Sequence, residues 1–178
     1  MRRNEIEALL PSVLQRTIAP GAPLATLLQI MDDLHAPAEE ILAGLERFFN
    51  AYGTPDEFVP YLASWVDLER FLEESPTGEA ASRVFVPGVG LLRELIVHAA
   101  YLSKWRGTQH GLLRFLEVAT GVEGFMVEEE TVDEEGRRRP FHLRVVAPAA
   151  AQPFATLVRR IVEQEKPAYV TAELVFGE

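Results

Sequence analysis

The stretch YLSKWRGTQHGLLRFLEVATG, residues 101–121, predicts a helix that ends, a sharp turn and a new helix in direct succession. Gly107 supplies backbone freedom at the point where the first helix stops. Thr108 is a good N-cap for the next helix, because its hydroxyl can accept a hydrogen bond from a backbone N–H one turn later. The apolar residues that follow at helical spacing are Leu112, Phe115, Leu116 and Ala119. Gly121 stands where a left-handed residue would end the second helix, so the segment predicts a helix–turn–helix corner.

The residues before this corner predict a succession of helices. Apolar stripes at helical spacing fall within residues 6–14, 24–31, 41–49, 58–72 and 91–102. Pro37, near the start of the third stripe, and Pro60, near the start of the fourth, suit a first helical turn. Prolines and glycines predict a linker at 18–23, a loop at 50–56 and the largest irregular stretch at 73–90.

After Gly121 the apolar period changes from that of a helix to that of a strand. Residues 124–130 and 141–146 alternate and predict a hairpin, and the turn at 133–140 is acidic in its first half and basic in its second. Residues 153–166 predict a helix that Pro167 ends, and residues 170–176 alternate as a last strand. A helix between two parallel strands is expected to form a right-handed crossover.

The sequence therefore predicts an α+β protein, mostly helical over its N-terminal two thirds and followed by a small β-hairpin–α–β C-terminal unit. We expect three parts: an N-terminal helix and linker arm at 1–23, a helical domain at 24–121 and a small α+β domain at 122–178. A sheet this small is marginal alone, so it should pack on the helical part or on a partner chain.

The composition of the chain excludes some kinds of binding partner. The chain has 178 residues and a formal net charge of −10, which argues against generic nucleic-acid binding and against adhesion to an anionic membrane. It contains no cysteine, which excludes disulfides and thiolate metal sites and fits assembly in a reducing compartment. We expect no signal peptide, because Glu5 and Glu7 interrupt the basic start, and no membrane insertion, because no apolar run approaches roughly 20 residues.

The sequence offers no catalytic, cofactor or metal site. The histidines (His35, His98, His110 and His142) lack metal-ligand spacing. His98 and His110 could meet across the corner as a proton shuttle or metal pair, but we favour two polar residues at a helix corner. The acidic runs 128–130 and 133–135 are expected to be solvated, and the basic run 137–139 is expected to balance the acidic half of its own turn. No serine (Ser64, Ser75, Ser82 or Ser103) has a G-x-S-x-G context, and Gly88-Val89-Gly90 lacks the third glycine of a dinucleotide-binding loop.

For three residues the sequence leaves open both a structural role and a contact with a partner chain. Arg106 is expected to bond carbonyls at the end of its own helix or a nearby carboxylate, or to contact a partner chain; we favour the structural role. Trp65 and Trp105 are candidate interface anchors, although core packing is the default for such side chains.

Four segments, taken in order, resemble the phage tail protein I family. They are Leu9-Leu10-Pro11, Pro55–Trp65, Arg106-Gly107-Thr108 with Gly111-Leu112 and Thr120-Gly121, and Lys166-Pro167-Ala168. Two departures bear on exact partner contacts: Val59-Pro60-Tyr61 replaces the more usual Leu-Pro-Trp, and Arg93 stands alone where the family often has a tryptophan or paired arginines.

The resemblance implies a non-enzymatic baseplate wedge protein of a contractile tail or contractile injection particle, assembled in the bacterial cytoplasm. Such proteins associate with a larger wedge partner in a ring around the central hub and spike, and they support the first layer of the sheath. No cofactor is implied. The residues that carry structural or interface roles in this interpretation are Trp65, Trp105, Arg106, Gly107, Thr108, Gly111, Gly121 and Pro167.

Two other functions compete with this one. The first is a small ligand-binding or regulatory module with a helical dimerisation platform, in which His142 and Arg144 would line a polar pocket in the sheet. The second is a hydrolase that uses His98 or His110 with a carboxylate.

Overall fold

The structure, a computed structural model, describes residues 3–74, 83–129 and 136–177. The chain forms two compact units, residues 1–50 and residues 51–178. The boundaries expected after residues 23 and 121 therefore fall within these units rather than between them. Several expectations fall on residues outside the described ranges: the contexts of Ser75 and Ser82, the breaks at Pro76 and Gly78, Glu130 and the acidic half of the turn, 133–135.

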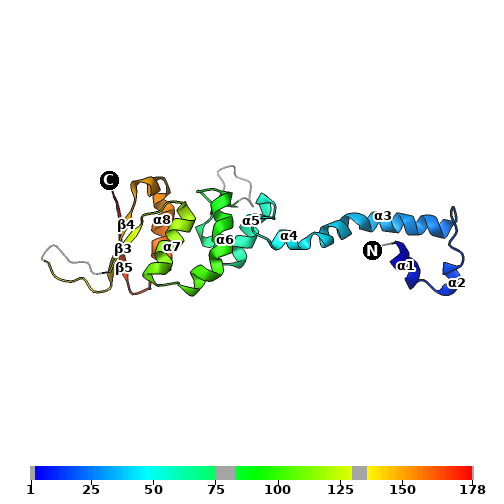
Figure 1. Ribbon diagram of the computed structural model, residues 1–178, viewed down its shortest axis with the longest axis horizontal. Helices are drawn as coiled ribbons and strands as arrows, with labels where there is room; N and C mark the ends of the chain where they lie inside the picture. The colour runs from blue at the N-terminus through cyan, green and yellow to red at the C-terminus, as the bar shows by residue number, and fades with distance from the viewer. Residues whose placement is uncertain (1–2, 75–82, 130–135, 178) are drawn as a thin grey trace. The chain divides into compact units, whose positions relative to one another are not determined.

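Unit 1 is built from helices (Figure 1). They are α1 (Arg3–Leu9), α2 (Ser12–Gln15), α3 (Pro23–Ala43) and α4 (Leu45–Phe49). α1 packs against α3, where Ile6, Ala25 and Leu28 are buried. Much of the remaining apolar surface of α3 and α4 is exposed.

The expectation that Pro37 begins a separate helix is wrong. Pro37 lies inside α3, which runs for 21 residues and ends at Gly44. Gly44 closes the helix, because its N–H donates to the carbonyls of Glu40 and Ile41. A proline removes one helical hydrogen bond, but the apolar period continues through it from Leu24 to Ile41, and the helix continues with it.

The helical part of unit 2 departs from the sequence prediction in two places. The helix expected over 58–72 begins as η1 (Asp56–Phe58), continues as α5 (Val59–Trp65) and is separated from η2 (Glu69–Phe71) at Asp67, which adopts a left-handed backbone with φ 60°. The stretch expected to be irregular contains β1 (Glu73–Glu74), which pairs antiparallel with β2 (Arg83–Val84). The two helices of the corner then follow as predicted, α6 (Val89–Lys104) and α7 (Gln109–Thr120).

The C-terminal part follows the predicted order of hairpin, helix and strand. β3 (Met126–Glu128) pairs antiparallel with β4 (His142–Ala147), and β4 pairs parallel with β5 (Thr171–Phe176), so β4 is central. The crossover between β4 and β5 contains η3 (Ala149–Phe154) and α8 (Ala155–Glu165). Phe141, the first residue of the stretch expected to form this strand, instead precedes β4, has a φ of 57° and is 66% exposed.

One core unites the helices and the sheet of unit 2. α7 and α8 lie on one face of the sheet (Figure 1), and the fully buried side chains come from several elements: Val59, Leu95, Leu116, Val145 and Ile161. Phe71 and Phe115 meet edge to face inside this core, with ring centroids 5.1 Å apart. The structure confirms the α+β class. Within the described residues, no helix combines the length and the apolar character that crossing a membrane requires.

Candidate functional site

The corner between α6 and α7 has the predicted capping geometry. The Thr108 hydroxyl accepts from the N–H of Gly111 at 3.1 Å and donates to the carbonyl of Trp105 at 2.7 Å. Gly107 has φ 74° and Gly121 has φ 69°, so both adopt the left-handed backbone that favours glycine. These three sequence predictions are confirmed, and the turn is fixed on both sides.

Gly111 has a role that helical spacing does not reveal. A Cβ at this position would lie 2.0 Å from the carbonyl oxygen of Trp105 and 3.0 Å from its Cβ. Only glycine lets the first turn of α7 approach the end of α6 this closely. Gly111 therefore sets the distance between the two helices at the corner.

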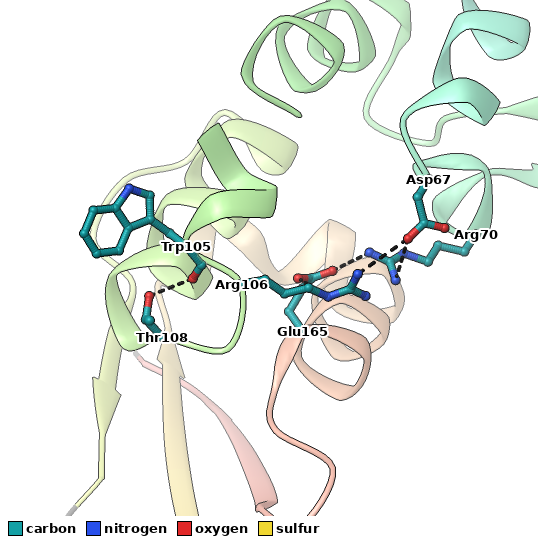
Figure 2. Close-up of polar contacts among 6 residues, drawn as sticks. All are labelled: Asp67, Arg70, Trp105, Arg106, Thr108 and Glu165. Carbon is teal, nitrogen blue, oxygen red and sulfur yellow. Dashed lines mark hydrogen bonds and ion pairs between the residues drawn. The ribbon is translucent and has the colours of Figure 1, made fainter. Parts of the chain in front are cut away.

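Arg106 belongs to an ion-pair network that joins three segments of unit 2 (Figure 2). Its Nε lies 3.4 Å from Oε2 of Glu165, and its Nη1 lies 3.6 Å from Oδ2 of Asp67. Arg70 completes the network, with Nη2 at 2.5 Å from Oε1 of Glu165 and Nη1 at 3.2 Å from Oδ2 of Asp67. Of the roles considered for Arg106, the structure supports the bond to a nearby carboxylate.

Glu165 is the centre of this network and was missed by sequence reasoning. It is only 6% exposed and ends α8. Burial raises the pKa of Glu165 above its ordinary value, while Arg106 and Arg70 act in the opposite direction. The available signal was its position: Glu165 falls four residues after Ile161, on the apolar face of α8, where a carboxylate requires a cationic partner.

Two tryptophans named as interface candidates are exposed rather than packed in the core. Trp65 is 59% exposed and meets Tyr61 edge to face at 5.4 Å. Trp105 is 38% exposed and lies edge to face with His110 at 5.7 Å. The default expectation of core packing is therefore wrong, because Trp65 ends α5 on an exposed side and Trp105 follows α6 at the exposed corner.

The two histidines at the corner bind different groups. Nδ1 of His98 lies 2.8 Å from the carbonyl of Glu94, on its own helix, and Nε2 of His110 lies 2.6 Å from the hydroxyl of Tyr101. The structure thus does not bring His98 and His110 together as a pair. Across the ranges 3–74, 83–129 and 136–177, no group of three or more His, Asp or Glu side chains is arranged to hold a metal ion.

His142 and Arg144, the residues named for a polar pocket, lie on β4 and bind neighbouring strands. Nδ1 of His142 lies 2.7 Å from the Thr171 hydroxyl, and its Nε2 lies 3.6 Å from the Glu173 carboxylate. Arg144 lies 3.8 Å from both Glu128 and Glu173. These contacts link the three strands across the outer face of the sheet. His142 also lines the cavity of about 340 Å³ beside the α6–α7 corner, whereas Arg144 does not.

Arg93 fixes the segment that precedes α5. Its guanidinium donates to the carbonyls of Ala51 and Thr54 and pairs with Asp56 at 2.5 Å. The Arg93 side chain is 13% exposed. A single arginine of α6 therefore holds the loop at 50–56 and the start of the motif at 55–65.

Pro167 follows α8, which ends at Glu165, and so confirms the predicted helix end. Beside it lies a cavity of about 340 Å³ whose lining includes Gly107 and Thr108 from the corner and Glu165, Lys166 and Pro167 from the end of α8. Two motifs that are far apart in the sequence thus meet at one place in unit 2.

The model of one protein family matches this chain. The family is described as phage tail protein (Tail_P2_I), and the match covers residues 23–169. Three of the four segments that carry the resemblance lie within it, and Leu9-Leu10-Pro11 precedes it. No curated protein matches the chain. Since the family model covers most of the sequence, including the corner and the end of α8, the chain belongs to the phage tail protein (Tail_P2_I) family.

Proposed function

We propose that this chain is a structural, non-enzymatic subunit of the baseplate wedge in a contractile tail or contractile injection particle. In this proposal it joins a larger wedge partner around the central hub and spike and supports assembly of the sheath above. It is assembled in the bacterial cytoplasm and works as part of the particle. Membership of the phage tail protein (Tail_P2_I) family supports the assignment of this chain to a tail. The helical surface of unit 1 supports assembly by packing against a partner chain.

The observation that carries the proposal is an apolar seam along α3 and α4. Its members are separated alternately by three and four residues, the spacing of a helix that packs along another helix. They are Leu24, Leu27, Met31, Leu34, Ala38, Ile41, Leu45 and Phe48. At 1.5 Å per residue, the 21 residues of α3 alone extend the seam over about 30 Å.

Much of this seam is exposed. The exposed fractions are 53% for Leu27, 73% for Leu34, 58% for Ile41 and 43% for Leu45. Contiguous apolar surface of this kind is typical of a protein–protein contact. The seam therefore favours a chain that completes its fold by packing against helices of a partner.

The acidic residues of α3 and α4 lie away from the seam. Asp32, Asp33, Glu39, Glu40 and Glu46 occupy positions that directly follow seam residues or lie two residues beyond them. In a helical bundle those positions face outward, so the charges remain solvated when the seam is covered. The charge pattern thus permits a helical partner on the apolar side.

Besides a surface that packs against a partner, a wedge protein requires a body of fixed shape. In this proposal unit 2 is that body. The ion pairs of Arg106, Arg70 and Glu165 join the α6–α7 corner to η2 and to the end of α8. Because the family segments lie at these contacts, we assign them to the internal geometry of unit 2. The exposed rings of Trp65 and Trp105 remain candidate contacts for further baseplate proteins.

The test uses charged substitutions on two sides of α3. Leu34→Glu with Ile41→Glu places two carboxylates in the seam, whereas Ala36→Glu places one on an exposed position outside it. We expect the double variant to lose both assembled particles and co-purification of the larger wedge protein with the tagged chain. Ala36→Glu should retain both. Normal particles from the double variant would refute the proposed mode of assembly.

A further inference from the structure

We propose that the outer edge of β5 accepts a β-strand from a partner chain, one that carries a basic side chain opposite Glu173. The proposal concerns unit 2 and goes beyond the helical contact of unit 1. It rests on three observations: unpaired backbone groups along β5, a groove beside this edge, and the charge of the residue at its centre.

Only half of the backbone N–H and C=O groups of β5 face β4 and form hydrogen bonds with it. Thr171 donates its N–H to the carbonyl of Phe141, and Gly177 donates to that of Ala147, so the odd-numbered residues of this strand face β4. Because backbone groups alternate in direction along a strand, those of Ala172, Leu174 and Phe176 point away from the sheet. Within the part of the chain that the structure describes, no strand pairs with this side of β5.

Glu173 is the one charged residue of this edge, which otherwise lacks the usual protection against pairing. β5 is six residues long and contains no proline, lysine or glycine, while β3 at the opposite edge has only three residues. Natural proteins commonly blunt an edge strand by shortening it or by placing proline or charged residues, lysine above all, on it, and of these β5 has only the charge of Glu173. The sheet thus has one short edge and one long edge open to an additional strand.

A groove lies beside the open edge. It has a volume of about 250 Å³ and is lined by Ala172 and Leu174 of β5 and by Arg159, Val162 and Glu163 of α8. A strand added to β5 would direct every second side chain toward α8. The apolar part of the groove lining is Val162, Ala172 and Leu174, between the charged Arg159 and Glu163, so we expect a small or medium apolar residue there.

The charges on the outer face of the sheet determine which strand can pair with β5. The side chains of the outer sheet face form a row across the three strands, Glu128 on β3, Arg144 on β4 and Glu173 on β5. Glu173 also lies 3.6 Å from Nε2 of His142, and its side chain is 43% exposed. Two copies of β5 paired antiparallel about Glu173 would place that carboxylate opposite itself, which is destabilising. A partner strand with lysine or arginine at that position instead pairs with Glu173.

Hydrogen exchange measured at single amides tests the proposal without any substitution. In the isolated chain, the amides of Ala172, Leu174 and Phe176 should exchange faster than those of Glu173 and Val175, which face β4. In purified assembled tails, the same three amides should slow by about tenfold or more. Unchanged exchange in the assembled tails would overturn the proposal.

A second copy is the competing occupant. Protection of the three amides in the isolated chain that increases with concentration, together with a dimer in sedimentation, would show that β5 pairs with itself and would also overturn the proposal. Imaging of the tails separates this inference from the baseplate assignment. If β5 is protected in a chain that lies elsewhere in the tail, strand addition is supported and only the baseplate wedge assignment is refuted. If the chain lies in the baseplate and β5 is not protected, only strand addition is refuted.

A pair of substitutions adds a functional measurement. Leu174→Pro removes an N–H that points away from β4 and so leaves the β4–β5 ladder intact, whereas Leu174→Val keeps that N–H. With the melting temperature of each variant as the measure of folding, we expect a folded Leu174→Pro chain to enter tails less than Leu174→Val does. Equal incorporation of the two folded variants would count against a strand at this edge.

Discussion

Glu165 at the end of α8 lies 2.5 Å from Arg70, which precedes it by 95 residues in the chain. The carboxylate is 6% exposed and its other oxygen lies 3.4 Å from Arg106. One buried acid therefore connects η2, the corner between α6 and α7, and the end of α8. These ion pairs join segments far apart in the sequence, in addition to the apolar core of unit 2.

The members of this network should differ in their effect on stability. Glu165→Ala leaves two arginines without their shared partner and should lower the free energy of unfolding by about 2–3 kcal/mol. Arg106→Ala should cost about 0.5–1 kcal/mol, because Arg106 is 44% exposed and its ion pairs are partly screened by water. Urea denaturation of the two variants measures the difference. Equal losses would contradict the central position of Glu165.

Glu165 should also contribute a pH dependence of stability. Its pKa is raised in the folded chain, so the folded state holds a proton that the unfolded state releases above the ordinary value of 4.5. The stabilising contribution of this group is fully present below that value and is lost as the pH rises through the folded-state pKa. Relative to Glu165→Gln, the unsubstituted chain should lose stability as the pH rises above 4.5. A constant difference between the two across pH 4–8 would show that burial does not shift this carboxyl.

Two glycines, each in the first turn of a helix, should respond in opposite directions to alanine. Gly111→Ala places a Cβ 2.0 Å from a backbone oxygen of Trp105, and relief of this clash should cost about 2 kcal/mol or more. Gly90→Ala, in the first turn of α6, meets nothing within 4 Å and should raise stability by about 0.5 kcal/mol. Melting temperatures of the two variants test this contrast. A Gly111→Ala chain as stable as Gly90→Ala would show that the helices at the corner can separate freely.

Arg93 should be more important to folding than an exposed arginine. Arg93→Ala removes donors from the carbonyls of Ala51 and Thr54 and should cost about 2–3 kcal/mol. Arg114→Ala, which breaks only a surface pair with Glu117, should cost less than about 0.5 kcal/mol. Limited proteolysis within residues 50–56 should accelerate in the Arg93 variant alone. Similar cleavage of both variants would remove Arg93 from the support of this loop.

Local signals predicted much of the fold from the sequence. Thr108, Gly107 and Gly121 each act through their own backbone or within one helical turn, so their roles at the α6–α7 corner could be inferred without knowledge of the packing. The alternation of the last strands and the stop at Pro167 are local in the same sense.

The features that sequence reasoning missed depend on contacts across the fold or on competition between signals. The partners of Glu165 and Arg93 lie 37 or more residues away, and no local pattern identifies them. Pro37 has a local preference for a first helical turn, but the apolar period that continues through it has the greater effect, and α3 continues to Ala43. Asp67 divides the helix that periodicity predicts over 58–72, because its backbone is left-handed. Since this residue is not a glycine, the sequence does not signal that conformation.

Imaging of purified particles by electron cryomicroscopy, with this chain identified by a fused tag, tests the central proposal most directly. We predict density for the chain at the baseplate, with the seam of α3 and α4 packed against helices of a larger wedge protein. Density for the chain at another part of the tail, or a seam that faces solvent in the assembled particle, would contradict the proposed function.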